Sequence, residues 1–317
     1  MKVVLIGAGV SGFSILKNLQ DSKDFRIFLI EKQESPFRKH LLIDWLIGKV
    51  SDSDFFFPLE SLKDKTPSLE VVKDRALKVN FEKKKIFLKE SESLDFDKII
   101  LCCGVRAKRM LFPGVYKEGV YYLGEEPSKL KQDLIIYEHI IIYSQTSLGI
   151  KLAKSLSSLG KDIKIVIGDS PLFSQEFIRK IQIFLGEKIP LYLNSQIEEA
   201  LGEGRVRAIK LSIGKFLACD ILIMDSGYLP NLSLLKDYPT MVEESVLRVD
   251  EYLRAGFPDC LACGDIVNSK LLSQLFKDNK SLAEEEARIV ANNILELKDK
   301  FIFPNSEQDP IESILEF

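Results

Sequence analysis

Two stretches of the chain repeat one order of apolar and polar positions. In the first stretch, an apolar run at 3–6 is followed by a glycine-rich turn, a helix-period segment at 10–19 and another apolar run at 26–30. In the second stretch, an apolar run at 140–143 is followed by a polar turn, a helix-period segment and an apolar run at 163–167. A strand, a helix and a second strand in this order form a βαβ unit with parallel strands. The chain is therefore predicted to be an α/β protein with two nucleotide-binding-like domains.

The segments between and after these units predict further elements. Short alternating runs at 71–94, separated by charged turns, are typical of a small antiparallel meander. The acidic segment after Phe303 is expected to be a loosely held terminal segment. Further strands are expected at 98–102, 221–224, 246–249 and 260–262, and helices at 148–159 and 281–297.

The composition is typical of an ordinary folded protein. The 317 residues are 46% hydrophobic, and 44 Lys and Arg against 47 Asp and Glu leave a net charge of −3. This balance gives no electrostatic basis for binding nucleic acid, which requires a basic face. No apolar run reaches the roughly 18 residues of a spanning helix, and no signal peptide is recognisable at the N-terminus. The expected location is the cytoplasm, with no membrane span.

Cysteine and histidine usage argues against several kinds of site. The chain has five cysteines and two histidines, which disfavours a disulfide framework, a histidine-rich metal site and a Ser-His-Asp hydrolase. Cys260 and Cys263 have C-x-x-C spacing, but strand residues three apart face opposite sides, so both are expected to pack in the core. Cys102 and Cys103, at the end of a predicted strand, are expected to diverge in the same way. His139 is expected to be a structural residue whose polar atoms are satisfied.

The glycine-rich turn has the spacing of a dinucleotide-binding motif. Gly7, Gly9 and Gly12 form G-x-G-x-x-G between an apolar strand and a helix. The first glycine allows a tight turn, the second lets the backbone approach a pyrophosphate, and the third lets the helix pack on the strand. Glu31 lies 19 residues after Gly12, at the end of the second strand, where a carboxylate can bond ribose hydroxyls. Together these residues predict a dinucleotide site at the N-terminus of the first helix.

Four ordered motifs give the chain a resemblance to a known family. The first glycine motif is followed by residues 98–104, by Gly227-Tyr-Leu-Pro-Asn231 and by Ala262-Cys-Gly-Asp265. In this order they resemble the FAD-dependent pyridine nucleotide-disulfide oxidoreductases, nearest the branch of ferredoxin reductases, rubredoxin reductases and nitrite reductase flavin modules. The resemblance implies two Rossmann-like domains, the second inserted in the first. The implied limits are 1–115 plus 237–317 for a split FAD-binding domain and 116–236 for an NAD(P)-binding-like domain.

The resemblance also implies roles for individual residues. The first glycine motif would bind FAD, and Asp265 beside Gly264 would bond the ribityl chain or the phosphate. Gly104 would let the backbone approach the flavin. Arg38, in the turn after the ribose acid, and Arg106 would contact phosphate or flavin, or would be solvated surface groups. No catalytic acid, base or nucleophile is assigned.

The second glycine motif departs from the family pattern. Ser144 and Thr146 replace two of its three glycines. A Cβ at the second position blocks the backbone approach that a pyrophosphate needs. Lys151 replaces a family glutamate near the nicotinamide, and Gly168 replaces the acid at the end of the second strand. These changes predict weak or absent NAD(P)H binding; a remodelled pocket with Asp169 on the ribose is the alternative.

The resemblance is incomplete in two further respects. No cysteine precedes Cys102, so the disulfide-reductase and peroxidase-like chemistries of the family are not expected. The interface domain that relatives usually carry after the last helix is not expected in this chain, which would leave the flavin open on one side or covered by a partner protein.

The leading hypothesis is a flavoprotein oxidoreductase that holds FAD non-covalently and exchanges electrons with a protein donor or acceptor. Two alternatives remain open. A non-catalytic scaffold subunit of a larger complex, flavin-bearing or even flavin-free, would suit the altered second motif. An ordinary NAD(P)H-dependent reductase would require an unusual phosphate loop.

Overall fold

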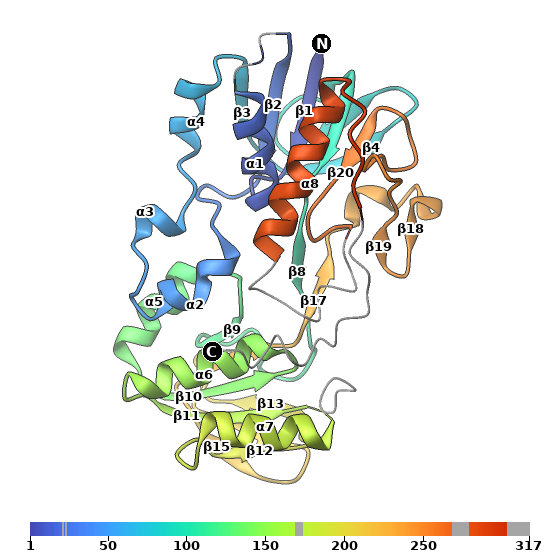
Figure 1. Ribbon diagram of the computed structural model, residues 1–317. Helices are drawn as coiled ribbons and strands as arrows, with labels where there is room; N and C mark the ends of the chain where they lie inside the picture. Colours follow the sequence, from blue (N-terminus) through green and yellow to red (C-terminus); the bar gives the residue numbers. More distant parts are fainter. Residues whose placement is uncertain (21, 23, 169–173, 268–278, 303–317) are drawn as a thin grey trace.

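The computed structural model describes residues 1–20, 22, 24–168, 174–267 and 279–302, which contain two five-stranded parallel sheets (Figure 1). The first sheet has the order β20-β7-β1-β2-β3, and every neighbouring pair is parallel. These parallel sheets and their covering helices confirm the predicted α/β class. The strands of the first sheet are β1 (Lys2–Ile6), β2 (Arg26–Glu31), β3 (Leu69–Lys73), β7 (Lys98–Leu101) and β20 (Cys260–Ala262).

Both faces of the first sheet are buried. Val3 and Leu5 of β1 join the core on one face, and Val4 and Ile6 join the core on the other. Two helices that pack against each other, α1 and α8, cover the first face (Figure 1), and a small antiparallel meander covers the second. Burial on both sides explains why these strands are apolar throughout. The covering elements are α1 (Val10–Leu19), α8 (Asn279–Ile294), β4 (Ala76–Asn80), β5 (Lys85–Leu88) and β6 (Leu94–Asp95).

The second sheet has the order β12-β11-β10-β16-β9 and is also parallel throughout. Helices α5, α6 and α7 contribute to the core on one face, and a three-stranded antiparallel sheet covers the other. The strands of the second sheet are β9 (Val120–Tyr122), β10 (His139–Ser144), β11 (Asp162–Ile167), β12 (Leu191–Tyr192) and β16 (Ile221–Asp225). The covering elements are α5 (Pro127–Ile136), α6 (Ser147–Ser158), α7 (Gln175–Leu185), β13 (Ile197–Leu201), β14 (Ala208–Leu211) and β15 (Phe216–Ala218).

The chain passes between the two halves through one pair of strands. β8 (Val105–Ala107) leaves the first half, β17 (Tyr228–Pro230) returns to it, and the two pair antiparallel between the sheets (Figure 1). The remaining short elements are η1 (Lys39–Leu41), α2 (Leu42–Leu46), α3 (Asp52–Phe55), α4 (Leu59–Lys65), η2 (Ser233–Leu235), η3 (Pro239–Met241), β18 (Val242–Glu243) and β19 (Val246–Leu247).

An aromatic cluster joins the segment after β2 to the second half. The Trp45 ring stacks on Phe55 with centroids 4.2 Å apart, and the Phe37 ring also stacks on Phe55, with centroids 5.1 Å apart. Lys131 of α5 places its Nζ atom 4.0 Å from the centre of the Trp45 ring. These aromatic residues share one continuous core with α5, α6 and β10, so the segment fixes the two halves against each other.

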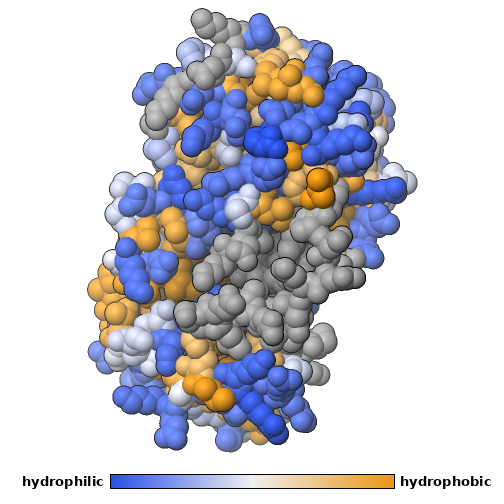
Figure 2. Space-filling model, in the orientation of Figure 1, coloured by the Kyte–Doolittle hydropathy of each residue, from blue (hydrophilic) through white to orange (hydrophobic). Residues whose placement is uncertain are grey.

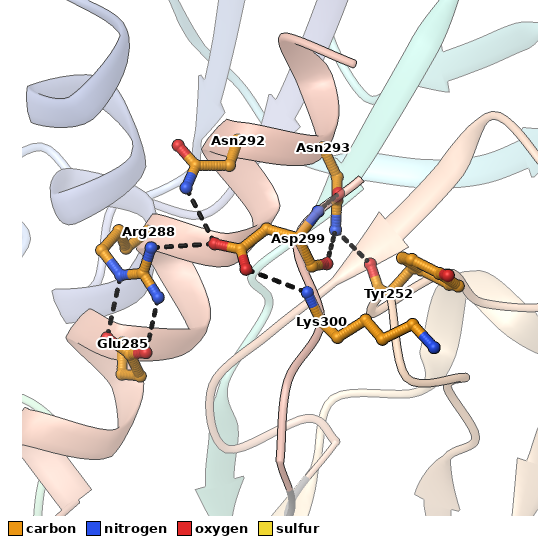
Figure 3. A network of polar contacts seen from close by, with 7 residues as sticks. All are labelled: Tyr252, Glu285, Arg288, Asn292, Asn293, Asp299 and Lys300. Atoms are coloured by element: carbon orange, nitrogen blue, oxygen red, sulfur yellow. Dashed lines mark hydrogen bonds and ion pairs between the residues drawn. The ribbon is translucent and has the colours of Figure 1, made fainter. Parts of the chain in front are cut away.

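A polar network fixes the end of α8 (Figure 3). Arg288 forms a two-point ion pair with Glu285 and also bonds Asp299 at 2.8 Å. Asn293 donates from its amide to the backbone oxygens of Tyr252 and Asp299, at 3.0 and 2.8 Å. The network holds the segment after α8 against the turn that precedes β20. It therefore fixes the end of α8 to the part of the chain that leads into β20.

Most predicted elements are confirmed, and one is assigned differently. The helix expected at 10–19 is α1, and those expected at 148–159 and 281–297 differ from α6 and α8 by one to three residues at each end. The meander expected at 71–94 begins only at Ala76, because residues 69–73 form the edge strand of the first sheet. The acidic tail and Asp169 lie outside the described residues. In the part of the chain that the structure describes, no helix combines the length and the apolar character needed to cross a bilayer.

Surface polarity agrees with the composition. Hydrophilic residues cover most of the described surface on the face shown in Figure 2, with apolar residues in separate areas.

His139 lies on the surface, and its Nδ1 atom forms a hydrogen bond with Asp162 at 2.9 Å, so the polar atoms of this histidine are satisfied as expected.

The aromatic cluster predicts a large effect for one substitution. Phe55→Ala removes a fully buried ring that stacks with two others and is expected to lower the free energy of unfolding by about 3–5 kcal/mol. Phe216→Ala is the control, because 63% of this side chain is exposed; a change within about 0.5 kcal/mol is expected. Urea denaturation of the two variants measures both values, and similar losses in the two would contradict the role of the cluster.

Candidate functional site

The turn from β1 to α1 is so tightly packed that two of its glycine positions have no space for a Cβ atom. Gly7 has φ +100°, and a Cβ there would overlap the carbonyl oxygen of Cys102. A Cβ at Gly12 would overlap the carbonyl oxygen of Gly7. At Gly9, the N-cap of α1, the space around an added Cβ is open to 4 Å. The open space at Gly9 is where a ligand's pyrophosphate can approach the backbone.

Glu31 braces this turn from the end of β2. Its Oε2 atom accepts a hydrogen bond from the Ala8 N–H at 2.7 Å, and its Oε1 atom accepts from the Gln33 N–H at 2.8 Å. The residue is 7% exposed. A carboxylate has about four lone-pair positions, so two acceptor positions remain for the hydroxyls of a ribose.

The Gly264-Asp265 turn faces the same site from the end of β20. Gly264 has φ +80° and donates its N–H to the Glu286 carboxylate of α8 at 2.6 Å. A Cβ at Gly264 would overlap the Ser11 hydroxyl, so this turn packs directly on the start of α1. Burial raises the pKa of Asp265, and the positive charge of Lys39 opposes that shift.

A first cavity lies between these turns, η1 and the start of α8, and a second cavity continues from it past Glu31. The two cavities share Gly7, Glu31, Lys32, Cys103 and Asn231, so together they form one elongated site on either side of the glycine turn. Six predicted site residues line the first cavity: Gly7, Gly9, Glu31, Gly104, Gly264 and Asp265.

The other three predicted site residues have different positions. Arg106 of β8 lines the second cavity, and Gly12 lies beneath the glycine turn. Arg38 donates to the backbone oxygens of Asp54 and Phe56, the latter at 3.1 Å, and its guanidinium lies 4.4 Å from the centre of the Phe57 ring. Arg38 therefore holds residues 54–57 in place through these contacts and is not part of the cavity wall.

The turn from β10 to α6, which corresponds to the first glycine turn, is filled by the protein itself. The Asp225 carboxyl, at the end of β16 and 1% exposed, accepts hydrogen bonds from the N–H groups of Thr146 and Gly149 at 3.2 and 2.9 Å. The hydroxyls of Thr146 and Ser144 also donate to it, at 2.7 and 3.1 Å. Thr146 is the N-cap of α6 and accepts from the Leu148 N–H. Burial raises the pKa of Asp225, and the donated hydrogen bonds partly offset this effect.

The end of β11 beside this turn is filled as well. A Cβ at Gly168 would overlap the Tyr143 hydroxyl, which explains why a small residue stands where the family has an acid. That hydroxyl donates to the Gln196 side-chain oxygen at 2.7 Å and accepts from the Gln145 amide at 2.9 Å. These side chains satisfy one another's hydrogen-bonding groups at the place where the family pattern has an acid.

Residues 1–285 match the family described as pyridine nucleotide-disulphide oxidoreductase. The chain belongs to this family. Membership confirms the predictions of an FAD-dependent oxidoreductase family and of two Rossmann-like domains.

This chain matches only part of the length of several similar proteins. The NADH-rubredoxin oxidoreductase of Clostridium acetobutylicum is 23% identical over 271 residues, which cover 84% of this chain and 68% of that protein. The assimilatory nitrate reductase electron transfer subunit of Bacillus subtilis is 20% identical, with 89% of this chain and 38% of that protein covered. A crystal structure of a ferredoxin reductase for the CYP199A2 system from Rhodopseudomonas palustris gives a TM-score of 0.76 at 22% identity, covering 92% of this chain and 76% of that one. At these identities the structural likeness shows the fold alone.

The cysteines of this oxidoreductase pair in a way that the sequence did not indicate. Cys102 and Cys263 belong to the core on one face of the first sheet, and Cys260 and Cys103 face the other, as expected from their spacing. Across neighbouring strands, however, the sulfur atoms of Cys102 and Cys263 lie 3.5 Å apart. Burial raises the pKa of Cys103 to about 12 and also raises that of Cys260. Thiols that stay protonated are poor nucleophiles, so a packing role is supported.

Two residues of the first cavity were missed by sequence reasoning. Lys39 donates from Nζ to the Val105 carbonyl oxygen at 2.8 Å, and burial lowers the pKa of its ammonium group. His40 lines the same cavity. Both follow Arg38 in the sequence, and only the 3₁₀ turn η1 shows that they face the cavity while Arg38 does not.

The glycine turn predicts opposite effects for two similar substitutions. Gly12→Ala places a Cβ against the backbone and is expected to destabilise the fold, by at least about 1 kcal/mol. Gly9→Ala meets open space and is expected to leave the free energy of unfolding within about 0.5 kcal/mol of the parent value.

FAD binding is expected to separate the two roles. Gly9→Ala should weaken FAD binding at least about tenfold, a loss of about 1.4 kcal/mol, because the new methyl group projects toward the pyrophosphate. Quenching of FAD fluorescence measures the affinity, and urea denaturation measures the stability. A Gly9→Ala protein that binds FAD as tightly as the parent would rule out this cavity as the diphosphate site.

Proposed function

We propose that this chain is an FAD-dependent electron-transfer protein whose electrons come from a protein partner rather than from NAD(P)H bound at the second glycine turn. The observation that carries the proposal is the Asp225 carboxyl, which occupies the first turn of α6. The cofactor site rests on the two joined cavities, and the partner rests on the altered second site.

The first half supports binding of FAD. The glycine turn offers the open space at Gly9 and the start of α1, which has no side-chain cap and no acidic residue in its first turn. Free N–H groups at a helix N-terminus bind phosphate oxygens. Glu31 would take the adenosine ribose, Asp265 the ribityl chain, and Gly104 would allow the flavin close to the backbone. Asn231 supports Gly104, because its N–H donates to the Gly104 oxygen at 2.9 Å and its side chain donates to Cys103 at 2.8 Å.

In the second half, the groups at the start of α6 oppose binding of a dinucleotide. The N–H groups of Thr146 and Gly149 that would meet a pyrophosphate already bond a carboxyl group. An incoming phosphate would have to displace Asp225, leaving a buried carboxyl without its donors, and such a loss costs about 1–3 kcal/mol or more. In its ionised form, Asp225 would also repel the phosphate.

The domain limits follow from this division. Residues 1–115 plus 237–317 would form the FAD-binding domain, with residues 303–317 outside the described part of the chain. Residues 116–236 would form the inserted domain, whose second nucleotide site has become a structural turn.

A protein partner agrees with the names of two similar proteins. One is named for rubredoxin and another is a ferredoxin reductase, and rubredoxin and ferredoxin are both proteins. By analogy, the flavin of this chain would exchange electrons with a small redox protein. The scaffold and the ordinary NAD(P)H-dependent reductase are the outcomes that the following experiment separates from this proposal.

An anaerobic titration tests the proposal. Addition of NADH or NADPH is expected to leave the flavin absorbance near roughly 450 nm unchanged, while dithionite bleaches it, because the donor site for nicotinamide is closed. Rapid bleaching by about one equivalent of NADH would contradict the proposal and identify an ordinary reductase. A protein that binds no FAD would favour the scaffold.

Substitution of Asp225 tests its part directly. Asp225→Ala is expected to lower the free energy of unfolding by about 1–3 kcal/mol, because buried donors lose their acceptor. It should also increase the affinity for NADH at least about tenfold, measured by calorimetry. Asp220→Ala is the control, because this aspartate bonds Arg207 away from the turn. If Asp225→Ala leaves NADH affinity unchanged, the carboxyl is not what closes the site.

A further inference from the structure

His40 has a buried nitrogen atom with no hydrogen-bond partner among the described residues. The imidazole projects from η1 into the first cavity, and its Nδ1 atom is removed from solvent. An unpaired buried polar atom costs about 1–3 kcal/mol, and native proteins rarely retain one without a ligand or an ordered water. A polar group of a ligand in the first cavity would satisfy this atom.

The position of His40 shows which part of the cofactor it would meet, if the proposed function holds. Glu31 marks the adenosine ribose, and the second cavity continues from Glu31 toward Asp74 and Ala76. The adenine would extend into that second cavity. The flavin would then lie in the first cavity, whose lining includes Asp265, Lys280 and His40. Lys280 is near enough to His40 to act on its charge.

The charges around His40 are mostly positive. The basic groups are Lys280 at the start of α8 and Arg38 and Lys39 on the segment of His40 itself. Asp265, Glu31 and Lys32 also line the cavity, and the charges of all three act on Lys39. Burial, and then Lys280 and Arg38, lower the pKa of His40 to about 4. With this pKa the imidazole is neutral at pH 7, and its two nitrogens act as one donor and one acceptor.

We propose that His40 is a cofactor-contacting residue: its Nδ1 atom forms a hydrogen bond with the flavin half of FAD, and its ring takes up a proton when the flavin is reduced. A flavin that accepts two electrons and one proton gains a negative charge. That charge favours the imidazolium form, in opposition to the nearby lysine and arginine. The second proton of the reduction then comes from solvent to His40, and the electrons come from the donor.

Histidine NMR gives a direct test, because the chain has only two histidines. Long-range ¹H–¹⁵N spectra of the apo protein, the FAD-bound protein and the dithionite-reduced protein follow both imidazoles through a pH titration, and His139→Gln assigns them. We expect FAD to shift the His40 nitrogen signals and reduction to raise the His40 pKa by at least one unit. His139, which bonds Asp162 on the surface, should remain unchanged and is the internal control.

The flavin midpoint potential gives a second readout that is independent of activity. A proton taken up with two electrons changes the potential by about 30 mV per pH unit. The parent protein should therefore show a slope of about 59 mV per pH unit below the pKa of His40 in the reduced state, and His40→Gln about 30 mV. His139→Gln should retain the parent slope.

The outcomes distinguish the two levels of the argument. Normal FAD binding with unshifted His40 signals, or equal slopes in the parent and His40→Gln proteins, would overturn the role of His40 and leave the proposed function intact. Failure of the parent protein to bind FAD would overturn both. If His40→Gln does not fold, the NMR titration of the parent protein decides.

Discussion

The unpaired N–H groups in the first turn of a helix govern both halves of this molecule. α1 starts at Gly9 with no side-chain cap, so its donors are available at the cavity. α6 starts on an equivalent turn, but Thr146 caps it and Asp225 accepts from its N–H groups. The same type of helix start is therefore open to the cavity in one half and bonded to its own chain in the other. The proposed difference in function between the halves rests on this contrast.

Close backbone packing keeps the open start of α1 in place. Gly7 and Gly264 adopt positive φ angles, and both lie so near neighbouring atoms that a larger residue would displace them. Two buried carboxylates, Glu31 and Glu286, then accept the N–H groups of Ala8 and Gly264, which fixes the turns on either side of the cavity. Hydrogen bonds also join residues of the cavity wall to one another, as from Lys39 to Val105 and from Asn231 to Gly104.

The features that depend on local periodicity and short motifs could be predicted from the sequence. α1, the buried strands and the glycine turn follow from residues close in the sequence, and six predicted site residues do line one cavity. The loss of glycines at residues 144–146 could be read from the sequence but its cause could not, because Asp225 lies 76 residues after Gly149. The direction of the His40 ring and the proximity of Cys102 to Cys263 depend likewise on turns and on strand order, which no local pattern encodes.

The β8–β17 pair has a consequence for motion within the molecule. Both crossings between the halves run side by side through one short antiparallel ribbon, which makes that ribbon the natural hinge. A rotation about it that separated the two halves would pull α2 and its aromatic neighbours away from α5 and α6 and would expose the rings of Trp45 and Phe55. Burial of the aromatic cluster thus opposes this rotation. The free energy of that burial would set how rarely the two halves separate.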